Sequence, residues 1–133
     1  MYDALDFNKN VHKIYEMSPS NKKHTCHALI VHCIDFRFQG AIRKLFNSLG
    51  LEHGHFDRLS VAGGAGNFKI LEEHAPLSKK LHKPKLAILT IHEDCGAGAK
   101  KEDLREARQI TKKSIPDTRC FYLKLNGHCE EVF

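Results

Sequence analysis

Three short polar segments hold the residues whose types and spacing could do chemistry. They read Cys33-Ile-Asp35-Phe-Arg37, Gly63-Gly-Ala-Gly66-Asn67 and His92-Glu-Asp-Cys95-Gly96. Each stands at the carboxyl end of a short apolar run, and in an open parallel α/β sheet the crevice beyond those strand ends is where ligands bind. A protein core alone would scatter such residues, so we expect the three segments to meet in one site.

Cys33, His92 and Cys95 form a donor set suited to zinc. Thiolate and imidazole are ligands that zinc prefers, and His-x-x-Cys lets two of them reach one ion from a single turn. Three protein ligands leave the fourth tetrahedral position to water, which is typical of a catalytic zinc. Taken singly, Cys33 reads as a small buried residue and His92 as a hydrogen-bonded loop histidine. The three together, at matching strand ends, favour a metal site.

Four apolar runs predict the strands that position these segments. Residues 28–34 and 86–91 are nearly continuous and rich in β-branched side chains, as in strands covered on both faces of a parallel sheet. Residues 56–62 and 120–125 alternate more between apolar and polar side chains, which indicates strands nearer an edge.

Helical patterns lie between these runs. Apolar residues at helical spacing predict a helix over 38–49, with Gly50 as its C-cap. A second helix begins at Phe68, and we expect Pro76 to end or kink it. A third is predicted from residue 100 to 115, where Pro116 stops it.

The order β-α-β-α-β-α-β indicates an α/β fold, a single-domain parallel sheet with right-handed crossovers and flanking helices. A chain of 133 residues is long enough for one domain. We place this domain at residues 25–133. Residues 1–24 are then a polar N-terminal arm, with one helical turn predicted around Val11–Tyr15.

The motif Cys33-x-Asp35-x-Arg37, followed by His92-x-x-Cys95-Gly96, resembles the paired signature of the β-carbonic anhydrases. Between them, the segment Ala65-Gly66-Asn67 is similar to the central Ala-Gly turn of that family. The similarity spans roughly residues 26–125, nearly the whole core. The chain therefore resembles a short, minimal member of the family, and the expected fold is β-carbonic-anhydrase-like.

The resemblance implies one zinc ion bound by Cys33, His92 and Cys95, and it makes Asp35 and Arg37 a catalytic dyad. The implied activity is that of a carbonic anhydrase, a lyase that reversibly hydrates carbon dioxide to bicarbonate through zinc-bound hydroxide. Zinc can lower the pKa of bound water to about 7. The Asp35 carboxylate can accept a hydrogen bond from this nucleophile, and Arg37 can hold the carboxylate off the metal. Without a neighbouring cysteine, the pair would read as an ordinary salt bridge at a helix N-terminus.

Four further residues are expected near the substrate, namely Phe36, Gly64, Gly66 and Gly96. The glycines let backbone pass close to the site and can supply N–H donors, in the case of Gly96 to bicarbonate. Phe36 stands where the family commonly has a small serine, and Gly63-Gly64 stand where an Arg-Asn pair often precedes the turn.

Two alternatives stay open. A related zinc hydrolase acting on carbon disulfide or carbonyl sulfide would be favoured by Phe36 and a hydrophobic channel. A non-catalytic zinc-binding scaffold of the same fold is the other, although a purely structural site has no need of Asp35 and Arg37. Other motifs are excluded. A cysteine phosphatase loop, Cys-x5-Arg, needs arginine at residue 39, which is Gln39. The dinucleotide-binding pattern Gly-x-Gly-x-x-Gly, the Walker loop and the thioredoxin-like Cys-x-x-Cys are absent.

Composition narrows the partners and the compartment. The net charge of +5 comes largely from scattered lysine pairs without interleaved aromatic residues, so we expect a solvated surface and no nucleic-acid partner. No apolar run approaches the ~20 residues of a membrane span, and the N-terminus has no secretory pattern, so we expect a cytoplasmic protein without a membrane partner. Five cysteines in a reducing compartment are expected to be free thiols. The family works as dimers or dimer multiples, so a homodimer or larger assembly is expected.

Overall fold

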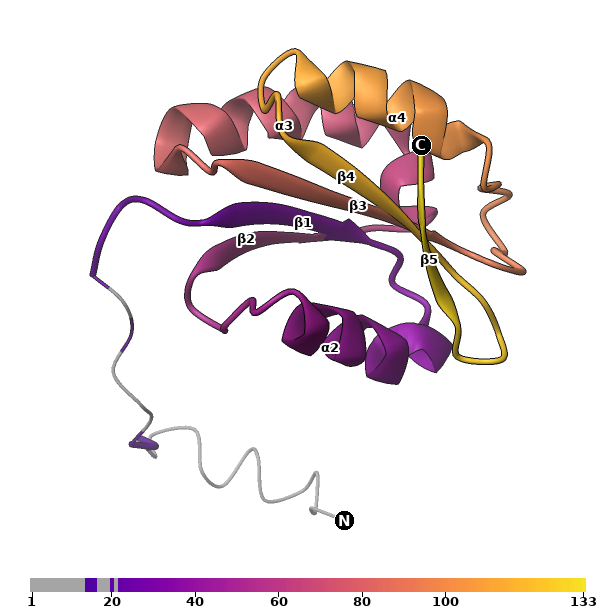
Figure 1. Cartoon of the computed structure of the whole chain (residues 1–133). Helices are drawn as coiled ribbons and strands as arrows, with labels where there is room; N and C mark the ends of the chain where they lie inside the picture. The colour runs from indigo at the N-terminus through magenta and orange to yellow at the C-terminus, as the bar shows by residue number, and fades with distance from the viewer. Residues whose placement is uncertain (1–13, 17–19, 21) are drawn as a thin grey trace.

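The computed structural model of the chain describes residues 14–16, 20 and 22–133. In these residues strands and helices alternate (Figure 1). Their bounds in chain order are β1 (Ala28–His32), α2 (Gln39–Ser48), β2 (Phe56–Ser60), α3 (Phe68–His82), β3 (Leu86–His92), α4 (Asp103–Lys112), β4 (Thr118–Leu123) and β5 (Cys129–Val132). Two short 3-10 turns, η1 (Phe36–Phe38) and η2 (Gly64–Gly66), precede α2 and α3.

The strands form one sheet in the order β2-β1-β3-β4-β5. The pairs from β2 to β4 are parallel, and only β5 runs antiparallel, against β4. Helix α2 covers one face of the sheet, and α3 and α4 cover the other (Figure 1). The predicted α/β class, a largely parallel sheet flanked by helices, is confirmed.

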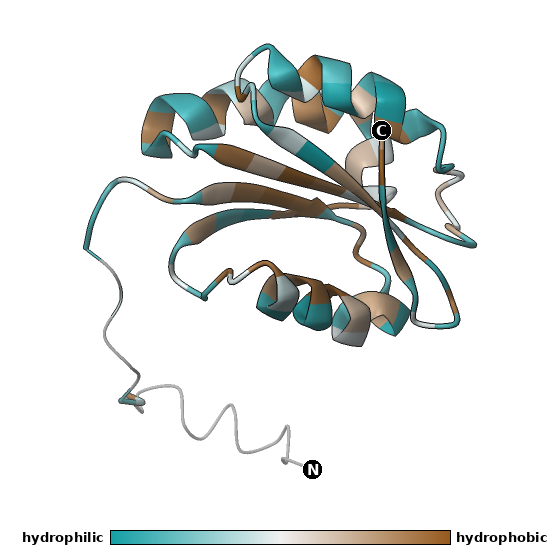
Figure 2. Cartoon of the chain, viewed as in Figure 1, coloured by the Kyte–Doolittle hydropathy of each residue, from teal (hydrophilic) through white to brown (hydrophobic). Residues whose placement is uncertain are grey.

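Two apolar clusters hold the layers together, one on each face of the sheet. On the α2 side, Ile30 and Ile88 of the central strands pack with Ile42 and Phe46 of the helix. On the other side, β1 and β3 pack against both α3 and α4, and the residues at this interface include Val31, Leu71, Leu89, Ile91 and Leu104. Figure 2 shows the hydrophobic strands β1 and β3 between helices that carry both hydrophobic and hydrophilic residues. Each fully buried Leu or Ile contributes about 1.5–3 kcal/mol of transfer free energy.

The burial of the strands matches what their sequences predict. Every residue of β1 is buried and β3 is buried along nearly its whole length, as expected for central strands. Strand β2, whose sequence alternates, is half-exposed and forms one edge of the sheet. The strands end one or two residues earlier than some of the apolar runs, so Cys33 follows β1 and is not part of it.

The expectation that Pro76 would end or kink the second helix is wrong as to its end, because α3 continues through Pro76 to His82. Proline lacks the N–H that would bond the preceding turn. The helix is kept on the sheet by buried residues on both sides of the proline, Leu71 and Ala75 before it and Ser78 after it. Tertiary packing thus outweighs the cost of one missing hydrogen bond.

Two further expectations need correction. The third helix is shorter than residues 100–115, because the carboxylate of Asp103 accepts a hydrogen bond from the N–H of Lys100 at 2.9 Å and residues 100–102 form a turn before α4. Strand β5 was not expected, since two of its four residues are glutamates and it lacks an apolar run. The Asn126-Gly127 pair, with Gly127 at φ 88°, makes the turn that folds β5 back on β4. Such a pair is a strong hairpin signal.

The predicted helical turn at Val11–Tyr15 lies mostly outside the described residues, and Ile14–Glu16 have no regular structure. The division into an arm of residues 1–24 and a domain of residues 25–133 remains a prediction. Within the described residues, every helix is too short or too polar to cross a membrane.

Candidate metal centre

The carboxyl ends of β1 and β3 lie side by side in the sheet and bring the predicted ligands together. The two strands are parallel neighbours, Cys33 follows the end of β1, and His92 is the last residue of β3. The thiol sulfurs of Cys33 and Cys95 and a ring nitrogen of His92 all lie within 4.8 Å of one another. Two of the three residues are buried, and the arrangement could hold a metal ion.

The two ring nitrogens of His92 differ in their hydrogen bonding. One is bonded to the backbone, and the other has no partner among the described residues. Its Nδ1 lies 2.7 Å from the carbonyl oxygen of Glu93, which can only accept, so Nδ1 carries the hydrogen. The ring stacks on Phe38 with centroids 4.1 Å apart and is 3% exposed. Nε2 therefore carries a lone pair and no hydrogen. Among the described residues it is the one buried side-chain nitrogen or oxygen without a hydrogen-bond partner. Metal-binding histidines are commonly oriented in this way.

The His92–Cys95 loop owes its shape to two residues that sequence reasoning passed over. Asp94 adopts φ 58°, a left-handed conformation, between the two predicted ligands. Glu93 fastens the loop to the β4–β5 hairpin, since its backbone N–H donates to Leu123 at 2.8 Å and its carboxylate accepts from the N–H of Leu125 at 2.9 Å. The sequence gives no sign of this role, because Leu125, the partner of the Glu93 carboxylate, is more than 30 residues away.

Asp35 and Arg37 are locked together beside the cluster. The Nε of Arg37 lies 3.1 Å from both carboxylate oxygens of Asp35, and its Nη2 is 2.7 Å from Oδ2. The backbone N–H of Arg37 also donates to Asp35, at 3.0 Å. These bonds lower the pKa of Asp35 from its ordinary range to about 2. The carboxylate is therefore ionised near neutral pH, and its Oδ2 lies 3.7 Å from Nε2 of His92.

Arg37 also ties the two motif loops to each other. Its guanidinium donates to the carboxylate of Asp94 at 3.2 Å and to the Asp94 carbonyl at 3.0 Å, while it holds Asp35 on the other side. These two acidic partners raise the pKa of Arg37, so its charge is permanent. One side chain thus sets the distance between the loop after β1 and the loop after β3. Asp94 is the contact that the sequence did not reveal.

The turn before α3 lies directly beneath the site. Gly64 has φ 55°, and a Cβ built on it would lie 2.6 Å from the carbonyl oxygen of Thr90 and 3.0 Å from the backbone N of Cys33. Only glycine fits between the ends of β1 and β3 in this way. Gly66 is packed as closely, since its Cβ would lie 2.7 Å from that of Ala99.

The other residues expected in a substrate pocket lie nearer the surface. Phe36, the residue after Asp35, is 76% exposed, and Gly96 is an exposed turn residue with open space around it. The role of Phe36, Gly64, Gly66 and Gly96 in substrate binding stays a prediction.

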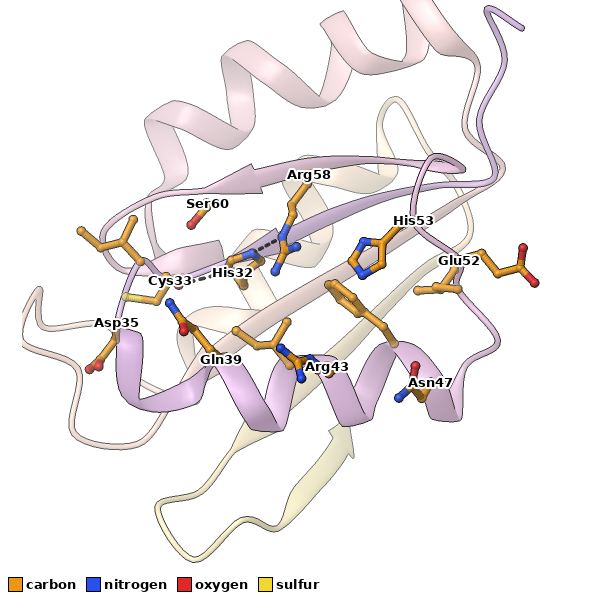
Figure 3. Close-up of a pocket in the computed structure, with 14 residues that line it drawn as sticks. His32, Cys33, Asp35, Gln39, Arg43, Asn47, Glu52, His53, Arg58 and Ser60 are labelled. Carbon is orange, nitrogen blue, oxygen red and sulfur yellow. Dashed lines mark hydrogen bonds between the residues drawn. The ribbon is translucent and has the colours of Figure 1, made fainter. Parts of the chain in front are cut away.

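His32, the residue before Cys33, is a further buried group that sequence reasoning missed. Its Nδ1 donates to the carbonyl of Cys33 at 2.9 Å, and its Nε2 accepts from Nε of Arg58 at 2.7 Å (Figure 3). Burial lowers the pKa of His32, which keeps the ring neutral and able to accept. All five cysteines are free thiols, as expected, and Cys120 is buried in the core.

Comparison with known proteins extends these observations. No family model matches the chain. An uncharacterised protein of Rickettsia bellii is 28% identical, over 79% of this chain and 80% of that protein. An uncharacterised protein of Rickettsia conorii is 27% identical, over 95% of this chain and 83% of that protein.

Solved structures share the fold. A carbonic anhydrase of Streptococcus mutans superposes with a TM-score of 0.59 at 16% identity, covering 100% of this chain and 99% of that one. A β-carbonic anhydrase of Trichomonas vaginalis gives 0.60 at 16% identity, with coverages of 99% and 98%. The apo form of a carbon disulfide hydrolase gives 0.53 at 15% identity, with coverages of 95% and 85%. The resemblance stated from the sequence is thus confirmed at the level of the fold, which is that of the β-carbonic anhydrases.

Proposed function

We propose that this chain is a zinc-dependent carbonic anhydrase that reversibly hydrates carbon dioxide to bicarbonate. The observation that carries the proposal is the buried, unpartnered Nε2 of His92, which faces the thiols of Cys33 and Cys95 beside the ionised Asp35. A buried nitrogen without a function would be expected to have a hydrogen-bond partner, because leaving a buried polar atom unpaired costs about 1–3 kcal/mol. A metal ligand accounts for it.

The donor set fits zinc in type and in spacing. Two thiolates and one imidazole are ligands that zinc prefers, and a set of three is typical of catalytic zinc. Bonds of about 2.0–2.3 Å to a tetrahedral ion need ligand atoms about 3.3–3.8 Å apart. The three ligand atoms already lie within 4.8 Å of one another, so an inward shift of about 1 Å closes the set. When bound, zinc supplies the acidity that yields a hydroxide nucleophile from water near neutral pH.

Asp35 and Arg37 would orient the nucleophile toward the substrate. An ionised carboxylate only accepts hydrogen bonds, so Asp35 can fix the hydrogen of the nucleophile and leave a lone pair for the carbon of the substrate. Arg37 uses Nε and Nη2 to keep both carboxylate oxygens turned toward itself. The carboxylate is thereby kept as a hydrogen-bond acceptor and is not available as a further metal ligand. A scaffold without activity would gain nothing from this arrangement.

The same geometry suits a hydrolase for carbon disulfide or carbonyl sulfide, and two observations favour it as the second candidate. Phe36 presents a largely exposed aromatic ring in the residue after Asp35, and a carbon disulfide hydrolase shares the fold. These substrates are linear and apolar like carbon dioxide, so the dyad would act on them in the same way. The identity of the substrate decides between the two.

The test is stopped-flow hydration of carbon dioxide on protein of known metal content. We expect about one zinc per chain by elemental analysis, with catalysis that depends on it. Cys33→Ala, His92→Ala and Cys95→Ala should each lose most of the zinc and the activity and keep the native circular dichroism. Cys129→Ala removes an exposed thiol of β5 and should keep both.

Three results would count against the proposal in different ways. Wild-type protein that is metal-free after preparation in zinc-sufficient medium would exclude the metal site. Zinc-loaded protein that hydrolyses carbon disulfide or carbonyl sulfide and does not hydrate carbon dioxide would establish the second candidate. Zinc-loaded protein inactive on all three substrates would indicate a scaffold.

A further inference from the structure

A groove of about 630 Å³ runs from the metal centre along helix α2, between that helix and strands β1 and β2. Cys33 and Asp35 line one end of it, and Asn47 and His53 line the other (Figure 3). This volume is within the range of about 300–1,000 Å³ found for sites that take small organic molecules. A triatomic substrate would occupy a small part of it, so the groove has room for a larger ligand.

Arg58 points into this groove from β2 and is held in place on two sides. Its Nε donates to the buried His32 at 2.7 Å, and its guanidinium carbon lies 5.1 Å from the centre of the Phe46 ring. The two terminal amino groups of Arg58 donate no hydrogen bond to residues 22–133, so they are free to bind a ligand. Among residues 22–133 no carboxylate lies within ion-pair distance of them. A guanidinium fixed in this way loses little freedom when it binds a ligand.

Arg43 lines the same groove from α2 and, among residues 22–133, likewise has no acidic partner. The groove has two carboxylates of its own, and neither is placed to neutralise the arginines. Asp35 is bound by Arg37, and the carboxylate of Glu52 lies 4.0 Å from His55. Two guanidinium groups without a counter-ion among residues 22–133 therefore line one cavity, Arg43 from α2 and Arg58 from β2.

We propose that this groove binds a small organic oxyanion, with its carboxylate or phosphate group held by Arg58 and Arg43. Planar guanidinium groups match both kinds of oxygen pair and form strong charge-assisted hydrogen bonds with them. The rest of the ligand would lie along α2, where Gln39 and Asn47 offer amide groups and Leu51 offers an apolar contact. The two arginines are not metal ligands, although the groove reaches Cys33 at one end, and anion binding by them does not depend on the proposed hydration reaction.

The test is a titration of the zinc-treated full chain with inorganic phosphate and, in a second series, with succinate, followed by ¹H–¹⁵N NMR. We expect saturable shifts of the amides that line the groove and of the Arg58 Nε–H signal, which is detectable because that hydrogen is already bonded to His32. Arg58→Gln and Arg43→Gln should each weaken binding at least ~10-fold, since each removes charge-assisted bonds. Arg43 is exposed on α2, so its variant keeps the test valid if Arg58→Gln fails to fold.

The matched control is Lys44→Gln, which removes the same charge from the next residue of α2, outside the groove. It should change the affinity less than ~2-fold. Binding should also persist in Cys95→Ser, in which the metal site is damaged and the groove is intact. Saturation by either probe supports the proposal and identifies the preferred group. It is overturned if neither probe saturates, if Lys44→Gln weakens binding as much as Arg43→Gln, or if the shifts are confined to the metal loops and vanish in Cys95→Ser.

Discussion

At the scale of single residues, hydrogen bonds made away from the cluster determine what each side chain offers to it. His92 gives its Nδ1 hydrogen to the carbonyl of Glu93 and so presents a bare Nε2. Asp35 is ionised because Arg37 donates to both of its oxygens, and Arg37 is in turn positioned by Asp94. Such outer contacts set tautomer, charge and orientation before any ion binds.

The first prediction concerns Asp35. Asp35→Asn keeps the size of the side chain, removes its charge and replaces one acceptor with a donor. Because the carboxylate is not among the three proposed ligands, zinc content should stay near one per chain, while carbon dioxide hydration falls at least ~10²-fold, the low end of what positioned acid–base groups contribute. Elemental analysis and stopped-flow rates on the same preparation measure both.

Asp117→Asn is the control for Asp35→Asn, since it makes the same change at an exposed residue before β4, and it should alter neither zinc nor rate. If Asp35→Asn keeps full activity with its zinc, the dyad is wrongly assigned even though the metal site stands.

The sequence predicted the residues of the cluster better than the residues that support them. Cys33, His92 and Cys95 are rare residue types at a recognisable spacing, and they follow strands whose apolar runs are plain. Glu93, Asp94 and His32 act through contacts with backbone or with residues distant in sequence. Acidic loop residues and a lone histidine have no periodicity, so their roles became visible only in three dimensions.

At the scale of elements, the turn before α3 positions the loop after β1, and the second prediction tests this. Gly64→Ala would place a methyl group 2.6 Å from the Thr90 carbonyl and 3.0 Å from the backbone N of Cys33, at a φ of 55° that alanine rarely adopts. We expect a loss of about 1–3 kcal/mol in the free energy of unfolding from overpacking and strain, together with weaker zinc retention. Urea unfolding and zinc release to a chelator measure the two effects.

Gly40→Ala is the matched control for Gly64→Ala, because its new Cβ meets nothing within 4 Å and the residue lies in α2. It should leave zinc retention unchanged and stability equal or slightly higher. Equal stability of Gly64→Ala and wild type would show that the turn has room to shift without disturbing Cys33.

The third prediction concerns β5 and its dependence on pH. Glu130 bonds to Lys124 at 2.6 Å and to Lys101 at 3.0 Å, and these contacts lower its pKa from 4.5 to about 2. A lowered pKa in the folded state means that the contribution to stability is complete above pH 4.5 and is lost as the pH falls toward 2. Glu130→Gln should therefore unfold at lower urea concentration than wild type at pH 7, and the gap should close in that window.

Glu73→Gln is the control for Glu130→Gln, because Glu73 is exposed on α3 and, within residues 22–133, no ion pair is formed by it. It should unfold like wild type at every pH. A gap between Glu130→Gln and wild type that is the same at pH 7 and pH 2 would contradict the assigned ion pairs.

The elements that sequence predicted well are those with long apolar runs or clear periodicity. Strands β1 and β3 fall into this group, and so does α2. Strand β5 was not predicted because it is short, contains two glutamates and is paired only along one side, so nothing in its composition requires a strand. Helix α3 runs past Pro76 because Ser78, which bonds to Asp57 of β2 at 2.7 Å, continues its buried face. In α3 a contact distant in sequence thus overrides the local signal, whereas the local signal for β5 lies in the Asn126-Gly127 turn and not in the strand itself.

At the scale of the whole molecule, both edge strands of the sheet, β2 and β5, lack an outer partner in the described structure. Strand β2 has a partner only on its β1 side, and it is half-exposed. Beside it on α3, Leu77 is 44% exposed and Leu81 is 52% exposed, one turn apart. Free strand edges and neighbouring exposed apolar side chains are features that proteins usually cover. A second copy of the chain, related by twofold symmetry, would cover both at once.

The last prediction is therefore a homodimer that forms across β2 and α3. Light scattering at micromolar concentrations should give a mass about twice 15.1 kDa. The double variant Leu77→Lys with Leu81→Lys should give the monomer mass, because apposed lysines would repel each other and lose apolar contact. Leu125→Lys makes the same change at a residue that is 54% exposed on the β4–β5 hairpin, away from β2, and should remain a dimer. A wild-type monomer would show that solvent covers the β2 edge, and a double variant that still dimerises would place the interface on another face.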